Sequence, residues 1–205
     1  ARAVEAYRNA LALSPDDDDV LTALQELYEE TEDWETLRKV LGRRVELNDA
    51  GVAVPLYVRM AEISHQKFNE VERAIEEYNA ALAIKPTADG VMRSLAGLYR
   101  DEERWKELLA MYERVLAATP SANSERTIAL QVEMADISAK YLGDEPTAIR
   151  YLEQILEADP NHLRALDVLA DLYGQQGDWD RGLKVLERRM KSCRTVEEQI
   201  DALMH

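Results

Sequence analysis

The stretch PNHLRALDVLADLYGQQGDWDRGLKVLERRM, residues 160–190, decides the fold. It predicts two short amphipathic helices joined by a turn that contains glycine, because apolar residues recur at the i, i+3, i+4, i+7 spacing of a helix buried on one side. These residues are Leu166, Leu169, Leu172 and Tyr173 in the first helix, and Trp179, Leu183, Leu186 and Met190 in the second. A hairpin of this kind cannot cover its own apolar faces, so it needs neighbours of the same kind.

The rest of the chain supplies those neighbours, because the same residues recur at a fixed spacing. Trp34, Trp105 and Trp179 lie 71 and 74 residues apart, and so do Pro15, Pro86 and Pro160. Apolar positions between them recur at the same two offsets: Leu21/Met92/Leu166, Leu24/Leu95/Leu169, Leu27/Leu98/Leu172, Tyr28/Tyr99/Tyr173 and Val40/Met111/Val185. Self-similarity at a fixed period indicates a repeat architecture.

Each long period holds a second hairpin of a different character. Its first helix carries Met60-Ala61-Glu62-Ile63-Ser64 and, 74 residues later, Met134-Ala135-Asp136-Ile137-Ser138. Its second helix carries Ala74, Tyr78, Ala81 and Leu82, matched by Ala148, Leu152, Ile155 and Leu156. The three-residue difference between the offsets falls in 119–126, opposite 48–53, where both segments are rich in turn-forming residues and added length costs little.

These patterns predict an all-α fold of about twelve helices, with no strand signal and no domain linker. The expected helices cover residues 2–13, 17–30, 33–47, 54–66, 70–84, 88–102, 104–118, 125–141, 145–158, 162–175, 178–191 and 195–205. They form one array over residues 1–205, with repeats at 15–48, 54–85, 86–119, 125–159 and 160–192 and partial repeats at 1–14 and 195–205. Both ends read as cuts in a longer array rather than as polar caps.

Composition and charge narrow the classes of partner. The chain of 205 residues has a formal net charge of −15, from 40 acidic and 25 basic residues. An excess of negative charge opposes binding to nucleic-acid phosphates or to an anionic membrane. No apolar run approaches the ~18 residues that span a bilayer, and no signal peptide is visible, so we expect a cytoplasmic protein. The single cysteine, Cys193, excludes an internal disulfide.

The residues that recur at equivalent positions of the hairpins resemble the tetratricopeptide repeat. Leu166, Leu169, Ala170 and Tyr173 stand at the first-helix positions of that family, and Gly182, Leu186 and Pro160 at later ones. In the other repeat type Ala74, Tyr78, Ala81 and Pro86 match the second-helix signature. Departures occur at Leu37 and Leu108, where the family favours alanine, and at Ser64 and Ser138, where tyrosine is usual. The resemblance implies hairpins stacked in a right-handed superhelical solenoid, with the first helix of each repeat lining a concave groove.

A partner usually lies in that groove, so the resemblance also implies the binding residues. Carried over position by position, the central column is Glu26, Glu62, Gly97, Asp136 and Asp171, with Arg93 and Asp167 one turn before it and Arg100 one turn after. Four of these five central residues are acidic, which favours a basic or amphipathic peptide or helix. Arg93 and Arg100 form a cationic pair that can hold one carboxylate.

The remaining signals have simpler structural interpretations. We expect the Trp column to pack against the preceding helix rather than to stack on a ligand, and the column of Met60, Met134 and Met204 to fill the core. Asp16–Asp19 lacks the glycine and distal glutamate of a calcium loop, so we expect it to cap a helix. The three histidines lie far apart in the repeat map, so we expect no metal site and no cofactor.

The sequence therefore predicts a non-enzymatic protein–protein interaction scaffold that binds a peptide or helix in its groove. Two alternatives remain open at this stage: a structural array that spaces or assembles other parts, and an accessory region of a larger enzyme. The open ends of the array also allow end-to-end self-association.

Overall fold

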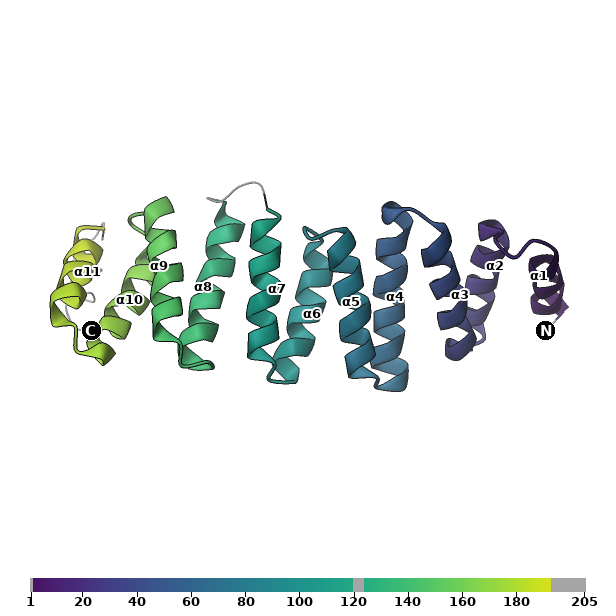
Figure 1. The fold of residues 1–205 in the computed structure, drawn as a ribbon, viewed down its shortest axis with the longest axis horizontal. Helices are drawn as coiled ribbons and strands as arrows, with labels where there is room; N and C mark the ends of the chain where they lie inside the picture. The colour runs from purple at the N-terminus through teal and green to yellow at the C-terminus, as the bar shows by residue number, and fades with distance from the viewer. Residues whose placement is uncertain (1, 120–123, 193–205) are drawn as a thin grey trace. The chain divides into compact units, whose positions relative to one another are not determined.

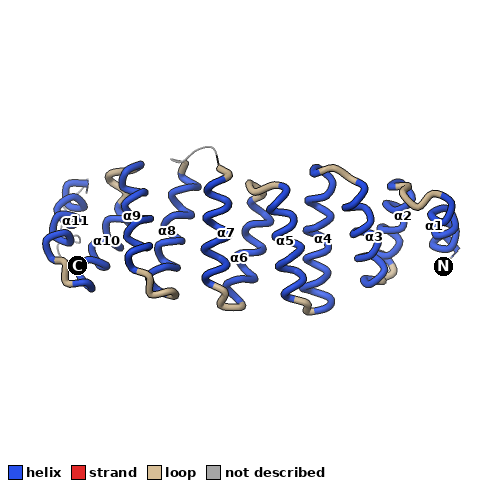
Figure 2. Tube along the Cα trace, viewed as in Figure 1, coloured by secondary structure: helices blue, strands red, loops and turns tan. Residues whose placement is uncertain are grey.

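The chain is helical throughout the parts that the structure describes. In the computed structural model these are residues 2–119 and 124–192, and Figure 2 shows only helices and loops there. The helices are α1 (Arg2–Leu13), α2 (Asp18–Glu30), α3 (Trp34–Leu47), α4 (Ala50–Phe68), α5 (Val71–Ile84), α6 (Asp89–Asp101), α7 (Trp105–Ala117), α8 (Glu125–Lys140), α9 (Glu145–Ala158), α10 (Leu163–Gln176) and α11 (Trp179–Ser192). The predicted all-α class is confirmed. The predicted helix at 195–205 lies outside the described residues.

The chain divides into two compact units, residues 1–102 and 103–205. The first unit contains α1 to α6 and the second contains α7 to α11 (Figure 1). Within each unit, the helices that share the larger interfaces are consecutive in the sequence, such as α4 with α5 and α10 with α11. Short turns join them, so each unit is a row of antiparallel helical hairpins. The two helices of the predicted repeat 86–119 fall in different units.

The predicted apolar columns form the cores of these rows. Leu24, Leu95 and Leu169 are at most 3% exposed, and the tyrosines of the adjacent column, Tyr28, Tyr99 and Tyr173, are at most 4% exposed. The second repeat type behaves in the same way, with Ala74/Ala148, Ala81/Ile155 and Leu82/Leu156 buried. Burial therefore recurs at positions related by the period.

Left-handed residues end the first helix of each hairpin at equivalent positions. Glu32, Glu103 and Gly177 are related by the offsets of 71 and 74 residues, and their φ angles are +55°, +53° and +72°. After two of them the next amide donates back into the helix, from Asp33 to the Tyr28 carbonyl at 3.0 Å and from Asp178 to the Tyr173 carbonyl at 2.9 Å. This is the hydrogen bonding of a Schellman turn.

The other repeat type closes its turn with one more residue. Asn69 and Gly143, 74 residues apart, have φ angles of +55° and +64°. The amides of Glu70 and Asp144 then donate to the carbonyls of Ser64 and Ser138, both at 2.8 Å. The two turn types therefore use the same left-handed conformation with different loop lengths.

Helix α4 begins four residues before the predicted start at residue 54. Asp49 is its N-cap, and the carboxylate accepts a hydrogen bond from the Gly51 amide at 2.9 Å. An acidic side chain at this position satisfies amides that the helix leaves without partners, which stabilises the earlier start. As a consequence Pro55 lies inside the helix instead of in its first turn.

Replacing Leu169 with alanine should lower the free energy of unfolding by about 2–5 kcal/mol, because buried methyl groups are lost and a cavity remains. Leu163 on the same helix is 39% exposed, and Leu163→Ala should cost less than about 0.5 kcal/mol. Urea denaturation measures both. A loss at Leu169 as small as that at Leu163 would contradict the assignment of the buried face.

Glu103→Gly should raise the free energy of unfolding by about 1 kcal/mol, because a left-handed conformation strains a residue that has a Cβ atom. Gly177→Ala should lower it by a similar amount at the equivalent turn. The control is Glu102→Gly, since Glu102 has a φ of −92° and gains nothing from glycine. Thermal or urea denaturation of the three variants tests the pattern; equal effects at 102 and 103 would exclude strain.

Candidate functional site

In each unit the candidate site is the surface of the first helices of its hairpins, α2, α4 and α6 in the first unit and α8 and α10 in the second. We call it the first-helix face and define it by the predicted residues: Glu26, Glu62, Arg93 and Arg100 in the first unit, and Asp136, Asp167 and Asp171 in the second. Glu26, Arg93, Arg100 and Asp171 are exposed, whereas Glu62, Asp136 and Asp167 are half-buried. The face therefore combines charges on exposed side chains with charges on half-buried ones.

In the first unit, Arg59 joins two acids of neighbouring first helices. Its guanidinium donates to Glu29 of α2 at 3.0 Å and to Glu62 of α4 at 3.2 Å. Burial lowers the pKa of Arg59, but the hydrogen bonds to Glu29 and Glu62 outweigh it and leave that pKa above its ordinary value. Glu62 is thus already neutralised by a neighbour within the chain.

In the second unit, arginines from later helices hold two of the three predicted acids. Asp136 of α8 accepts from Arg164 of α10 at 2.7 Å and forms an ion pair with Lys140 at 3.0 Å. Asp167 of α10 forms an ion pair with Arg189 of α11. Asp171 has no ion-pair partner among the described residues. These ion pairs reduce the negative charge that the acidic column offers to a ligand.

Arg59, Arg164 and Arg189 were not among the residues predicted from the sequence. The i, i+3 spacing of Arg59 and Glu62 was visible as a helical ion pair. The other two pairs join different helices at separations of 28 and 22 residues, and no local pattern signals them. Sequence reasoning therefore found the acids and missed the cations that hold them.

Trp34 and Trp105 contact residues at the end of the following first helix, and Trp34 also packs against a core cluster that includes residues of α2 and α4. Lys67 of α4 lies 4.6 Å above the Trp34 ring, and Tyr141 stacks on Trp105 with ring centroids 3.8 Å apart. Lys67 and Tyr141 are themselves equivalent positions, 74 residues apart. The third tryptophan differs, because Trp179 is 68% exposed. The prediction that the tryptophans pack therefore holds for Trp34 and Trp105, and Trp179 departs from it.

A hollow of about 650 Å³ lies beside this exposed tryptophan. Ala170, Gly174 and Gly182 contribute its small residues, and the larger side chains come from Trp179, Leu183 and Leu186. The predicted binding residues Asp167 and Asp171 also line it. We call it the α10–α11 hollow.

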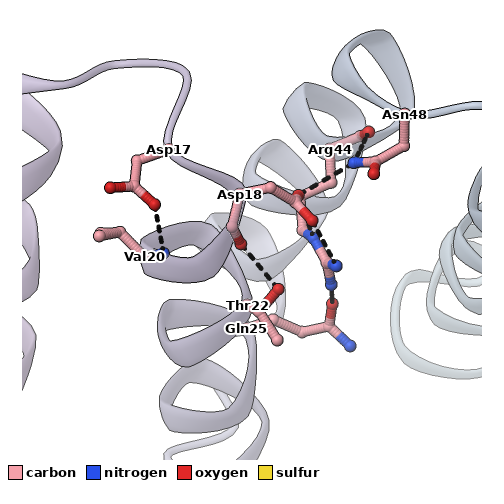
Figure 3. A network of polar contacts seen from close by, with 7 residues as sticks. All are labelled: Asp17, Asp18, Val20, Thr22, Gln25, Arg44 and Asn48. Carbon is pink, nitrogen blue, oxygen red and sulfur yellow. Dashed lines mark hydrogen bonds and ion pairs between the residues drawn. The ribbon is translucent and has the colours of Figure 1, made fainter.

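A separate polar network braces α2 against α3 in the first hairpin (Figure 3). Arg44 is only 9% exposed, and its guanidinium donates to both carboxylate oxygens of Asp18, at 2.8 and 3.1 Å. It also donates to Gln25 at 2.5 Å, and Asn48 donates to Asp18 at 3.0 Å. Asp17 caps α2 by accepting from the Val20 amide, which confirms the capping role predicted for this acidic run.

The network shifts the titration of one carboxyl group. The hydrogen bonds from Arg44 lower the pKa of Asp18, partial burial acts in the opposite sense, and the hydrogen bond from Asn48 lowers the pKa further. The pKa of Asp18 therefore lies below the ordinary value for an aspartate. The network serves to position α3 on α2, so we assign it to the scaffold and not to the ligand surface.

Searches for a metal site and for a membrane span find neither in the described part of the chain. No group of three or more His, Cys, Asp or Glu side chains there is placed to hold a metal ion. None of its helices is both long enough and apolar enough to cross a bilayer.

Comparison with known proteins gives family and structural matches. Tetratricopeptide repeat families match residues 142–203 and residues 91–126, and no curated protein sequence matches the chain. The C-terminal part of a TPR repeat-containing protein from Cytophaga hutchinsonii is 17% identical with a TM-score of 0.52, over 98% of this chain and 79% of that one.

Two further solved structures are similar. YrrB, described as a TPR protein with an unusual peptide-binding site, is 16% identical over 98% of this chain and 100% of its own, with a TM-score of 0.51. MamA is 12% identical over 82% of this chain and 94% of its own, with a TM-score of 0.50. At these identities the likeness concerns the fold alone.

Asp18→Asn should reduce the free energy of unfolding at pH 7 by about 1 kcal/mol, a modest value because solvent screens an aspartate that is one-third exposed. Since the folded state lowers the pKa of Asp18, its contribution is complete above the ordinary aspartate pKa of about 3.9 and is lost as the pH falls below it. Urea denaturation at pH 7 and pH 3 should show the difference between variant and parent shrinking. Asp19→Asn, at an exposed position of the same turn, removes the same charge without touching the Arg44 network and is the control.

Proposed function

Because the chain is a tetratricopeptide repeat protein, we propose that it is a non-enzymatic scaffold that binds a peptide or a helical segment of a partner protein on the first-helix face. A row of rigid helices presents side chains at fixed spacing, so binding orders little of the protein itself. The peptide-binding site named for YrrB supports the proposal by analogy of fold.

The proposal rests on a difference among the charged residues of this face: some form ion pairs within the chain, and others have no such partner among the described residues. Glu62, Asp136 and Asp167 are paired with arginines within the chain. Glu26 and Asp171 are exposed and have no ion-pair partner among the described residues. Charges that the fold does not use remain available to a ligand.

Those free charges define the chemistry of the partner. Glu26 and Asp171 attract a basic or amphipathic segment, and the net charge of −15 raises its rate of encounter. Arg93, also exposed and without an ion-pair partner among the described residues, can bind a carboxylate of a ligand on the first unit. We therefore propose that the ligand is a predominantly basic segment with one apolar side. That side would pack on the helix surface between the charged residues.

Selection of binders from a random peptide display library tests the proposal. The selected peptides should be rich in lysine and arginine, and their affinity should fall as salt is raised. The variant Glu26→Lys with Asp171→Lys should bind them about tenfold more weakly or worse, because like charges then face each other. Fluorescence anisotropy of labelled peptides gives the affinities.

The matched control reverses two exposed acids on second helices, Glu76→Lys on α5 with Glu187→Lys on α11. It changes the net charge by the same amount and leaves the first-helix face intact. Equal weakening by the two double variants would mean that only net charge matters. Full affinity in the first variant would exclude the first-helix face as the binding surface.

A further inference from the structure

We propose that the first-helix face of the first unit binds a partner segment that carries charges of both signs, with its basic end on α2 and its acidic end on α6. The inference rests on the proposed scaffold function and deepens it. It names the order of charges in the ligand and the direction in which the ligand crosses the helices. It concerns residues 1–102 alone.

Charges without an ion-pair partner lie at the two ends of this face. Helix α2 contains acidic residues and no basic ones, and Glu26 is exposed on it. Helix α6 carries Arg93, which is exposed and has no ion-pair partner among the described residues. Helix α4 lies between α2 and α6 in this unit (Figure 1). The face is therefore negative at one end and positive at the other.

The charges of the middle helix are already used within the fold. Arg59 of α4 donates to Glu29 of α2 at 3.0 Å and to Glu62 of its own helix at 3.2 Å. Val58, one turn before Glu62, is half-buried and offers apolar surface. A ligand that crosses α4 therefore gains little from a charged group there and more from an apolar side chain.

Gly97 leaves Arg93 open to a ligand. It occupies the position of Glu26, 71 residues earlier, and a Cβ atom built on it would meet no atom within 4 Å. A glutamate at position 97 would lie at the i, i+4 spacing from Arg93, at which side chains on one helix form ion pairs. The acid that would neutralise Arg93 is thus missing, and a carboxylate of the ligand can take its place.

The second unit has no such opposition of charge among its predicted binding residues. These are Asp136, Asp167 and Asp171, and all three are acidic. In the first unit, Glu26 and Arg93 have opposite signs. A basic end of the ligand therefore suits both units, whereas an acidic end distinguishes the first unit from the second.

The spacing of packed helices sets the length of the ligand. Helix axes in contact lie about 8–10 Å apart, so Glu26 and Arg93, two first helices apart, are separated by roughly 20 Å. An extended chain advances about 3.3 Å per residue, so about six residues separate the two charged ends of the ligand.

A synthetic probe peptide tests the direction of binding. It has a pair of lysines at its amino end, a pair of glutamates at its carboxyl end and about six small or apolar residues between them. Added to the isotope-labelled full chain, it should shift NMR resonances of α2, α4 and α6. A nitroxide at its lysine end should broaden resonances near Glu26 more than those near Arg93. Equal broadening at both places, or no shift of these helices at about 1 mM peptide, would overturn the inference.

Two substitutions at one position test the acidic end. Gly97→Glu should weaken binding of the probe about fivefold, because the new carboxylate pairs with Arg93 and repels the glutamates of the peptide. Gly97→Gln adds a side chain of the same size without the charge, and it is the matched control. The open space at Gly97 accommodates both side chains, and circular dichroism verifies the fold. Equal affinities of the two variants for the probe would contradict the assignment of the acidic end to α6.

Exchanging the two end charges tests the polarity of the face. The double variant Glu26→Arg with Arg93→Glu has the net charge of the parent and the opposite order of charges. The nitroxide at the lysine end should then broaden resonances of α6 in preference to those of α2. If the label stays on α2, charge does not set the direction and the inference is wrong.

A second peptide, with lysines in place of the glutamates, separates the inference from the proposed function. It should bind the first unit about fivefold more weakly than the probe does, because Arg93 repels it. If both peptides bind the first unit equally and Glu26→Lys weakens both, the inference fails and the proposed function stands. If Glu26→Lys with Asp171→Lys affects neither peptide, the first-helix face is excluded and both proposals fail.

A second copy of the chain is the other occupant that this test recognises. Sedimentation velocity would then show a dimer of the parent chain that dissociates in Gly97→Glu and persists in Gly97→Gln, with no binding of the probe. That result would overturn the assignment to a partner segment.

Discussion

The structure depends on one constraint: the second helix of each hairpin has an outward apolar face that only a following helix can cover. Trp34 and Trp105 start second helices, and in both cases the cover comes from the end of the next first helix. The constraint explains why the apolar columns repeat with the hairpins.

Polar chemistry varies between hairpins that share the same backbone. Ser64 is fully buried and donates to the Glu77 carboxylate at 2.7 Å, but its equivalent Ser138 has a buried hydroxyl without a hydrogen-bond partner. The reason is that Tyr151 stands at the position of Glu77 and directs its hydroxyl to Glu113 at 2.5 Å. Burial, with the hydrogen bond to Glu113, raises the pKa of Tyr151 to about 12. Apolar packing is therefore the same in equivalent hairpins, whereas the hydrogen-bond partners of equivalent polar residues differ from one hairpin to the next.

The sequence predicts the hairpins and their buried faces because both follow from periodicity, which is a local property. Helix starts are less predictable: residues 48–53 are rich in turn-forming residues, yet Asp49 caps α4 and the helix begins at Ala50. The candidate site is predicted only in part. The acids of the first-helix face follow from repeat position, whereas Arg164 and Arg189 reach them from other helices through long flexible side chains. The exposure of Trp179 had no local signal either, since it depends on what lies beyond the hairpin.

The larger interfaces within each unit join helices that are consecutive in the sequence, and this has a consequence for how the protein acquires its structure. Closing a contact between adjacent helices needs only a short loop, so little chain entropy is lost before packing begins. Proteins with such low contact order fold rapidly. Hairpins of this kind can form one after another as the chain leaves the ribosome, each providing a surface for the next.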